Sequence, residues 1–208
     1  DIGVIDLCLA DMDGDGDMDV LRCQGLVYPH TISWWQNTGG GTFSTLNHVI
    51  SDQTSNPIGV GAADLDGDGD NDVIACGYDW VSSFENTGGG TFATGSSVLG
   101  SGVIVTAPPL LVDVNSDSDA DLIIPDYGTT YCLLGSTGMA FQTPIPVSLF
   151  ANWGKDADAG DFDGDGHQDL VLATWTDDQV RVCFGDGAGG WPVITELVVS
   201  CSPIFSRP

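Results

Sequence analysis

Basic residues are nearly absent from this sequence. Its 208 residues hold four Lys and Arg in total against 30 Asp and Glu, which gives a formal net charge of −26. Binding to nucleic acids depends on Lys and Arg that neutralise phosphates, so we expect no nucleic-acid partner. The sequence also has no apolar run of the length that a membrane-spanning helix needs, and we expect no membrane insertion.

Glutamate, helical periodicity and paired cysteines are scarce as well. Only two of the 30 acidic residues are Glu. No long apolar segment repeats with the helical period of about 3.6 residues, so a helical fold is not expected. None of the six Cys lies in a CxxC pair, which argues against a zinc site. The even count allows up to three disulfides, but buried free thiols in strands are an equal alternative for most of them.

Aspartate is abundant and concentrated in one repeated motif. A nine-residue acidic loop occurs four times, at residues 11–19, 64–72, 113–121 and 161–169, and contains 18 of the 28 Asp. The loops start 53, 49 and 48 residues apart, which indicates a repeat architecture. Each loop places a carboxylate or amide oxygen at its positions 1, 3, 5 and 9.

These oxygens are the hard ligands that calcium prefers. We expect side chains at positions 1, 3, 5 and 9 and the main-chain carbonyl at position 7 to surround one ion. The loops together would hold up to four Ca²⁺. The predicted metal-binding residues are Asp11, Asp13, Asp15, Asp17 and Asp19; Asp64, Asp66, Asp68, Asp70 and Asp72; Asp113, Asn115, Asp117, Asp119 and Asp121; and Asp161, Asp163, Asp165, His167 and Asp169.

Two other calcium motifs do not fit. An EF-hand loop needs a bidentate Glu at position 12 and flanking helices. Position 12 here is Arg22, Ala75, Ile124 or Leu172, and the flanking segments resemble strands. Tandem nonapeptide repeats are excluded because the copies lie about 50 residues apart.

Short β-branched and apolar runs flank every loop and predict an all-β fold. The repeated unit reads as four antiparallel strands with a Gly-rich turn that ends in Phe or Trp. Such a unit is typical of one blade of a β-propeller. We therefore predict a β-propeller built of four-stranded antiparallel blades, with four repeats in this chain. The predicted blades are residues 1–50, 51–103, 104–152 and 153–208.

The loops, together with the NTGGGTF segments at residues 37–43 and 86–92, resemble the FG-GAP/VCBS repeats of integrin-α-like β-propellers. The resemblance implies that calcium rigidifies the first hairpin of each blade. The third loop departs from the motif because Ser116 and Ser118 replace glycines and Asn115 replaces Asp. We expect it to be the weakest site. Rings of this family usually have seven blades and sometimes eight, so four repeats fit a fragment, half of a two-chain ring or a compact four-bladed ring. A disulfide between Cys8 and Cys201 could hold a closed ring together.

In relatives of this kind, ligands tend to meet the face opposite the calcium loops. The variable loops expected there hold aromatic residues that could stack on sugars or anchor a protein. The alternative is that half or more of these rings pack between blades. The candidate ligand-binding residues are Tyr28, Tyr78, Trp80, Tyr127, Trp153 and Trp175. Trp34 and Trp35 lie on a predicted strand and are expected in the core.

The predicted function is that of an extracellular, calcium-stabilised module with a structural, adhesive or recognition role. Its expected partners are protein subunits or cell-surface glycans, with self-association as a further option. One alternative is a lectin-like carbohydrate-binding module, and a second is a polysaccharide lyase-like enzyme. We expect no enzyme activity because the sequence has no nucleophile elbow or HExxH motif.

Overall fold

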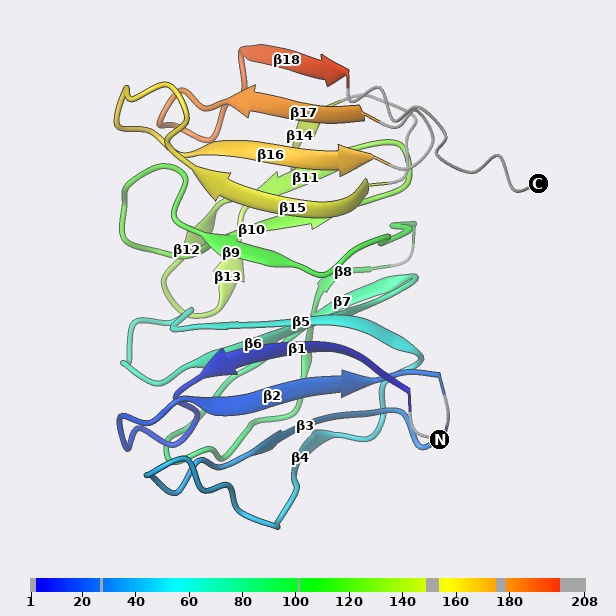
Figure 1. Cartoon of the computed structure of the whole chain (residues 1–208), viewed down its shortest axis with the longest axis vertical. Coiled ribbons are helices and arrows are strands. Elements are labelled where there is room, and N and C mark those ends of the chain that lie inside the picture. The colour runs from blue at the N-terminus through cyan, green and yellow to red at the C-terminus, as the bar shows by residue number, and fades with distance from the viewer. Residues whose placement is uncertain (1–2, 27, 101, 149–153, 175–178, 199–208) are drawn as a thin grey trace, which may run out of the picture.

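A computed structural model describes residues 3–26, 28–100, 102–148, 154–174 and 179–198. These residues form strands, turns and loops, and no helix occurs among them. Accordingly, the described residues include no helix that could cross a membrane. The strands build four antiparallel four-stranded sheets and one short hairpin (Figure 1). The all-β prediction is confirmed.

The first two sheets each contain one acidic loop, and their strands are hydrogen-bonded in chain order. Sheet 1 consists of β1 (Val4–Ala10), β2 (Asp19–Gln24), β3 (Thr31–Trp35) and β4 (His48–Ser51). Sheet 2 consists of β5 (Pro57–Ala63), β6 (Asp72–Gly77), β7 (Trp80–Phe84) and β8 (Ser96–Leu99).

The last two sheets repeat this plan. Sheet 3 consists of β9 (Leu110–Val112), β10 (Asp121–Pro125), β11 (Thr130–Leu133) and β14 (Ile145–Ser148). Its turn before β14 contains the hairpin of β12 (Gly135–Ser136) and β13 (Ala140–Phe141). Sheet 4 consists of β15 (Gly154–Gly160), β16 (Asp169–Thr174), β17 (Gln179–Phe184) and β18 (Val193–Val198).

Each predicted blade range contains one sheet, except that β4 ends at Ser51, one residue past the predicted boundary. Among the first strands of the four sheets, β15 is the one that its own composition does not predict, because its sequence is GKDADAG. It forms nevertheless, since its neighbour β16 is apolar and pairs with it from Gly154↔Thr174 to Gly160↔Asp169. A strand is stabilised by its cross-strand neighbours, so its own composition is a weak guide.

The core lies between successive sheets. One apolar cluster fills the space between sheets 1 and 2, a second lies between sheets 2 and 3, and a third lies between sheets 3 and 4. The first strands β1, β5, β9 and β15 contact one another in that order. Figure 1 shows the result as an open stack in which β4 and β18 lie at opposite ends. Each inner sheet therefore buries both of its faces.

The described cysteines are free thiols. Cys23, Cys76, Cys132 and Cys183 are fully buried, and Cys8 is half-buried against sheet 2. Burial raises the pKa of Cys23 to about 12 and that of Cys183 to about 11, so these thiols are unreactive at neutral pH. No disulfide occurs among the described residues, which favours the buried-thiol alternative. Cys201, the expected partner of Cys8, lies outside them.

Candidate metal centres

The four acidic loops occupy the same place in their sheets. Each one connects the first strand to the second, and the antiparallel order brings all four to one edge of the stack. The loop has no strand pairing of its own, so its backbone groups depend on side chains. The aspartates meet this need in a pattern that recurs from loop to loop.

Position 1 of the loop organises the turn. Asp11 accepts hydrogen bonds from the main-chain N–H of Gly14 at Oδ1 (2.8 Å) and of Gly16 at Oδ2 (2.8 Å). Asp64 and Asp161 accept the same pair of bonds in their own loops, at 2.7 Å from position 4 and 3.0 Å from position 6. These bonds need positive φ at both donors, which is +79° at Gly14 and +91° at Gly16. Glycine adopts this conformation without the steric penalty of a Cβ.

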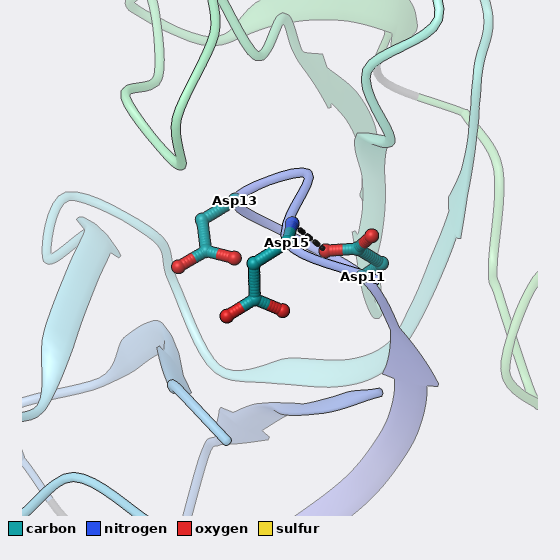
Figure 2. Close-up of side chains that lie close together, drawn as sticks. All are labelled: Asp11, Asp13 and Asp15. Carbon is teal, nitrogen blue, oxygen red and sulfur yellow. Dashed lines mark hydrogen bonds between the residues drawn. The ribbon is translucent and has the colours of Figure 1, made fainter. Parts of the chain in front are cut away.

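Carboxylates gather inside the turn. In the first loop, ligand oxygens of Asp11, Asp13 and Asp15 lie within 4.8 Å of one another. Figure 2 shows these three side chains grouped around the loop, with the Asp15 N–H donating to Asp11. Equivalent groups occur in the second loop (Asp64, Asp66, Asp72) and in the fourth (Asp161, Asp163, Asp169). Three of the four loops therefore present a set of hard oxygen donors that can hold a metal ion.

The electrostatics of these groups favour a bound cation. Burial raises the pKa of Asp13, and the charges of Asp15 and Asp19 add to the rise. Burial also raises the pKa of Asp72 to about 6. In addition, Asp13 Oδ1 is buried and has no hydrogen-bond partner among the described groups. An orphaned carboxylate oxygen beside other carboxylates is costly, and a metal ion would satisfy it.

Position 9 has a structural role that the sequence did not reveal. Asp19, Asp72, Asp121 and Asp169 are fully buried. In the second loop, Asp72 Oδ2 accepts from the N–H of Leu65 (2.9 Å) and Oδ1 from the N–H of Asn86 (2.7 Å). The other three position-9 aspartates accept the corresponding pair, from position 2 of their loop and from the turn that follows the third strand. This residue thus ties the loop to a turn 14 or more residues away.

The third loop keeps the shape but not the donor set. Ser116 and Ser118 adopt φ of +61° and +74°, in the left-handed region that the glycines occupy elsewhere. Asn115 donates from Nδ2 to Asp117 Oδ2 (2.8 Å). Within the part of the chain that the structure describes, this loop forms no cluster of three acidic side chains. That it is the weakest site stays a prediction, and these features agree with it.

Neighbouring sheets also support the first loop. The Asn86 side chain donates from Nδ2 to the Met12 carbonyl (2.9 Å), and Asn71 donates to the Asp11 carbonyl (2.9 Å). Within the same repeat, Gln36, which follows β3, donates to Asp13 Oδ2. None of these three amides was predicted as part of a site. The recurrence of Asn37 and Asn86 in the two NTGGGTF segments was the available signal, because a repeated Asn at a turn suggests side-chain bonds to the backbone.

The candidate ligand-binding aromatics divide into two groups. Tyr28, Tyr78 and Tyr127 are 83%, 56% and 49% exposed, in loops at the edge opposite the acidic loops. Trp80 instead packs against the core between sheets 1 and 2 and donates from Nε1 to the Ser55 carbonyl (2.7 Å). Trp153 and Trp175 lie outside the described residues. Trp34 is buried as expected, and Trp35 lies 4.4 Å under the Arg22 guanidinium.

Solved structures show the same fold over most of this chain. A lectin from Agrocybe aegerita that specifically recognises non-reducing terminal N-acetylglucosamine matches 90% of the chain with a TM-score of 0.66 and 22% identity. BBS1N, solved in complex with ARL6DN, matches 92% with a TM-score of 0.62 and 11% identity. The chain spans 50% and 56% of these two proteins.

Sequence comparisons settle the family. The curated proteins contain no match to the chain. The FG-GAP-like repeat family, in contrast, matches it three times, at residues 11–75, 64–124 and 113–172. Each match begins at the first residue of one acidic loop and extends past the next loop into the strand that follows it. The chain therefore belongs to the FG-GAP-like repeat family.

Proposed function

We propose that this chain is a calcium-stabilised, propeller-type recognition module that works outside the cell. The recurrence of one acidic loop at the first hairpin of all four sheets supports this proposal most directly. Each loop combines a turn organised by position 1 with a buried position-9 Asp that holds a distant turn. Calcium at these loops would fix the edge of every sheet.

Calcium fits the donor set better than magnesium does. The donors are carboxylates on a flexible turn, and Ca²⁺ accepts six to eight oxygens in irregular geometry, whereas Mg²⁺ demands an octahedron and retains waters. Extracellular calcium modules bind with dissociation constants of about 10⁻⁴–10⁻³ M, an affinity that suits the high calcium concentration outside the cell and not the low concentration inside it. The formal charge of −26 would also be reduced by each bound ion. These arguments support the proposed extracellular location and a structural role for calcium.

Thermal unfolding with and without calcium tests the metal assignment. Because calcium binds the folded loops and not the unfolded chain, EDTA should lower the melting temperature by many degrees, and added Ca²⁺ should restore it. Magnesium at the same concentration serves as the control and should restore much less. An unchanged melting temperature in EDTA would contradict the proposal.

The recognition surface that we propose is the edge opposite the acidic loops. Exposed tyrosines present a flat apolar ring together with a hydroxyl, which suits stacking on a sugar or contact with a protein. Tyr28, Tyr78 and Tyr127 lie at this edge, one in each of sheets 1 to 3. The fold shared with the N-acetylglucosamine-recognising lectin makes glycans the first class to test. The proposal assigns no catalytic role to the module.

A glycan array separates the ligand classes. We expect calcium-loaded protein to bind at least one glycan, and replacement of Tyr28, Tyr78 and Tyr127 by Ala to abolish the signal. Leu26→Ala is the control, since Leu26 is 72% exposed in the same loop as Tyr28 and has no ring to stack. An array without any signal would direct the search to protein partners, and turnover of a polysaccharide would contradict the absence of catalysis.

A further inference from the structure

The two end sheets of the stack expose faces that are buried in the sheets between them. We call the face of a sheet that packs on the preceding sheet its leading face, and the face that packs on the following sheet its trailing face. Leading faces present loop positions 10 and 12 on the second strand of each sheet. These residues are buried in sheets 2, 3 and 4, as Val73 and Ala75, Leu122 and Ile124, and Leu170 and Leu172.

The leading face of sheet 1 is open. Leu7 and Leu9 of β1 are 60% and 59% exposed, whereas Val60, which corresponds to Leu7 in sheet 2, is only 3% exposed. Leu7 pairs with Arg22 and Leu9 pairs with Val20, and Val20 pairs with Trp35, so these side chains share one face of the sheet. Apart from Arg22, these side chains are apolar, as they are on the buried leading faces of the other sheets. Within the described part of the chain, it has no covering sheet.

The trailing face of sheet 4 is open in the same way. The residue at loop position 2 is buried by the next sheet in the first three loops, where Met12, Leu65 and Val114 are 0%, 6% and 2% exposed. Its equivalent in the fourth loop, Phe162, is 53% exposed. Phe162 is thus an exposed aromatic residue at a position that the next sheet covers in the other three repeats, which indicates that a covering neighbour is missing here.

The charges on the two open faces are complementary. On the leading face, the Arg22 guanidinium lies over Trp35, and no carboxylate of the described residues is within ion-pair distance of it. On the trailing face of sheet 4, β15 presents Asp156 and Asp158, which are both exposed. Opposite charges on two apolar faces favour their association and set its register.

The contact between sheets 1 and 2 shows where these groups would meet. Asp6 on β1 accepts from the main-chain N–H of Val60 in sheet 2 (3.0 Å). Counted from the start of each loop, Asp156 corresponds to Asp6 and Leu7 corresponds to Val60. Cys8 and Ala75 lie in one cluster at the same contact, and they correspond to Asp158 and Arg22. Asp158 of sheet 4 is thus the counterpart expected to face Arg22.

We propose that a second copy of this chain docks head to tail on these faces. The leading face of sheet 1 in each copy packs on the trailing face of sheet 4 in the other copy. Phe162 then packs against Val20 and Trp35, and Asp158 pairs with Arg22. Two such contacts close a ring with a twofold axis. One copy matches half of the Agrocybe aegerita lectin, so two copies supply the length that the lectin has in one chain.

Light scattering after size-exclusion chromatography tests the proposal on calcium-loaded protein. At about 10 µM, a range in which specific interfaces are populated, we expect twice the mass of one chain and no larger species. Leu7→Asp should give a monomer, because it places a charge in an apolar contact. Leu26→Asp is the matched control and should stay dimeric, since Leu26 is exposed and lies in the loop between β2 and β3.

Charge exchange makes the test specific for the two faces. Arg22→Asp and Asp158→Arg should each be monomeric, because each places like charges opposite one another. An equimolar mixture of the two variants should form dimers, since both contacts of the mixed ring again join Arg to Asp. Each variant alone should retain the calcium-dependent melting temperature, which separates loss of docking from loss of folding.

Three results would overturn the proposal. The first is a wild-type protein that is monomeric at about 10 µM. If such a monomer dimerised only after deletion of residues 199–208, that segment would be identified as the cover of an open face. The second is a dimer that Leu7→Asp does not change. The third is a mixture of charge variants that stays monomeric. Because no sugar is involved, the outcome is independent of ligand recognition by the tyrosine edge.

Discussion

Individual aspartates in one loop have different tasks, although the sequence presents them as one motif. Asp72 is fully buried and accepts two main-chain N–H groups, whereas Asp68 is exposed and accepts one N–H within its own turn. The first residue is needed for the fold with or without metal. The second has no such structural role, and we propose that it serves chiefly as a calcium ligand.

This difference predicts opposite effects of two identical substitutions. Asp72→Asn turns an amide donor toward an existing N–H donor, and we expect it to lower the free energy of unfolding by about 1–3 kcal/mol even in EDTA. Asp68→Asn removes one charge from a repelling cluster, so it should leave the metal-free protein unchanged or slightly more stable while it weakens calcium binding. Urea unfolding in EDTA and calorimetric calcium titration measure the two effects. Equal losses of stability in EDTA would contradict the assignment.

The raised pKa values of buried carboxylates predict the pH dependence of the metal-free protein. Burial raises the pKa of Asp72 to about 6 and also raises the pKa values of Asp13 and Asp121. A carboxyl group whose pKa is higher in the folded state favours folding when it is protonated, and this contribution is lost as pH rises through the folded-state pKa.

In EDTA the protein should therefore be more stable at pH 5 than at pH 7. In saturating calcium the order should reverse, because the ligands must be ionised to bind the ion. The prediction is tested by measuring the melting temperature at both pH values, once in EDTA and once in calcium, and comparing the two pH values within each condition. A metal-free protein that is less stable at pH 5 would contradict the effect of these three groups.

At the scale of single elements, the acidic loops reach the same backbone shape by different residues. The first, second and fourth loops use glycine at the two left-handed positions, and the third uses Ser116 and Ser118. For a residue with a Cβ, this conformation costs about 1–2 kcal/mol. Glycine avoids that cost, but its more flexible unfolded chain offsets part of the advantage.

Exchanging these residues should move stability in opposite directions. We expect Ser118→Gly to raise the free energy of unfolding in EDTA by about 0.5–1 kcal/mol and Gly16→Ser to lower it by a similar amount. Gly16 is the equivalent position in the first loop, and a Cβ there would have no other atom within 4 Å. The Ser substitution therefore tests the backbone conformation without a steric clash. Changes of the same sign would show that other interactions decide the cost of the turn.

At the scale of the whole molecule, stability depends on contacts between neighbouring sheets. Sheet 2 shares one apolar cluster with sheet 1 and another with sheet 3, whereas sheet 4 shares a cluster with sheet 3 at one end of the stack. In a linear array of repeats, a weakened inner unit affects two interfaces and a weakened end unit affects one.

The position of a metal site should therefore decide its effect on unfolding. In saturating calcium, at a dilution that prevents association, Asp66→Asn with Asp68→Asn should lower the free energy of unfolding by roughly twice as much as Asp163→Asn with Asp165→Asn. Both pairs replace positions 3 and 5 of a loop, so the chemistry is matched. Equal losses would mean that each sheet unfolds without regard to its neighbours.

The sequence by itself determined the elements and the chemistry of the loops. Short β-branched and apolar runs predict the strands, because β-branched side chains favour the extended backbone locally. The spacing of Asp residues defines the turn within nine residues. Three features needed the tertiary structure. Strand β15 forms although it is acidic, because β16 pairs with it. Asp72 accepts a hydrogen bond from the main-chain N–H of Asn86, 14 residues away, and only the folded sheet brings the two groups together. The exposure of Leu7 and Phe162, finally, depends on which sheets lie beside them, since burial is a property of neighbours distant in the chain.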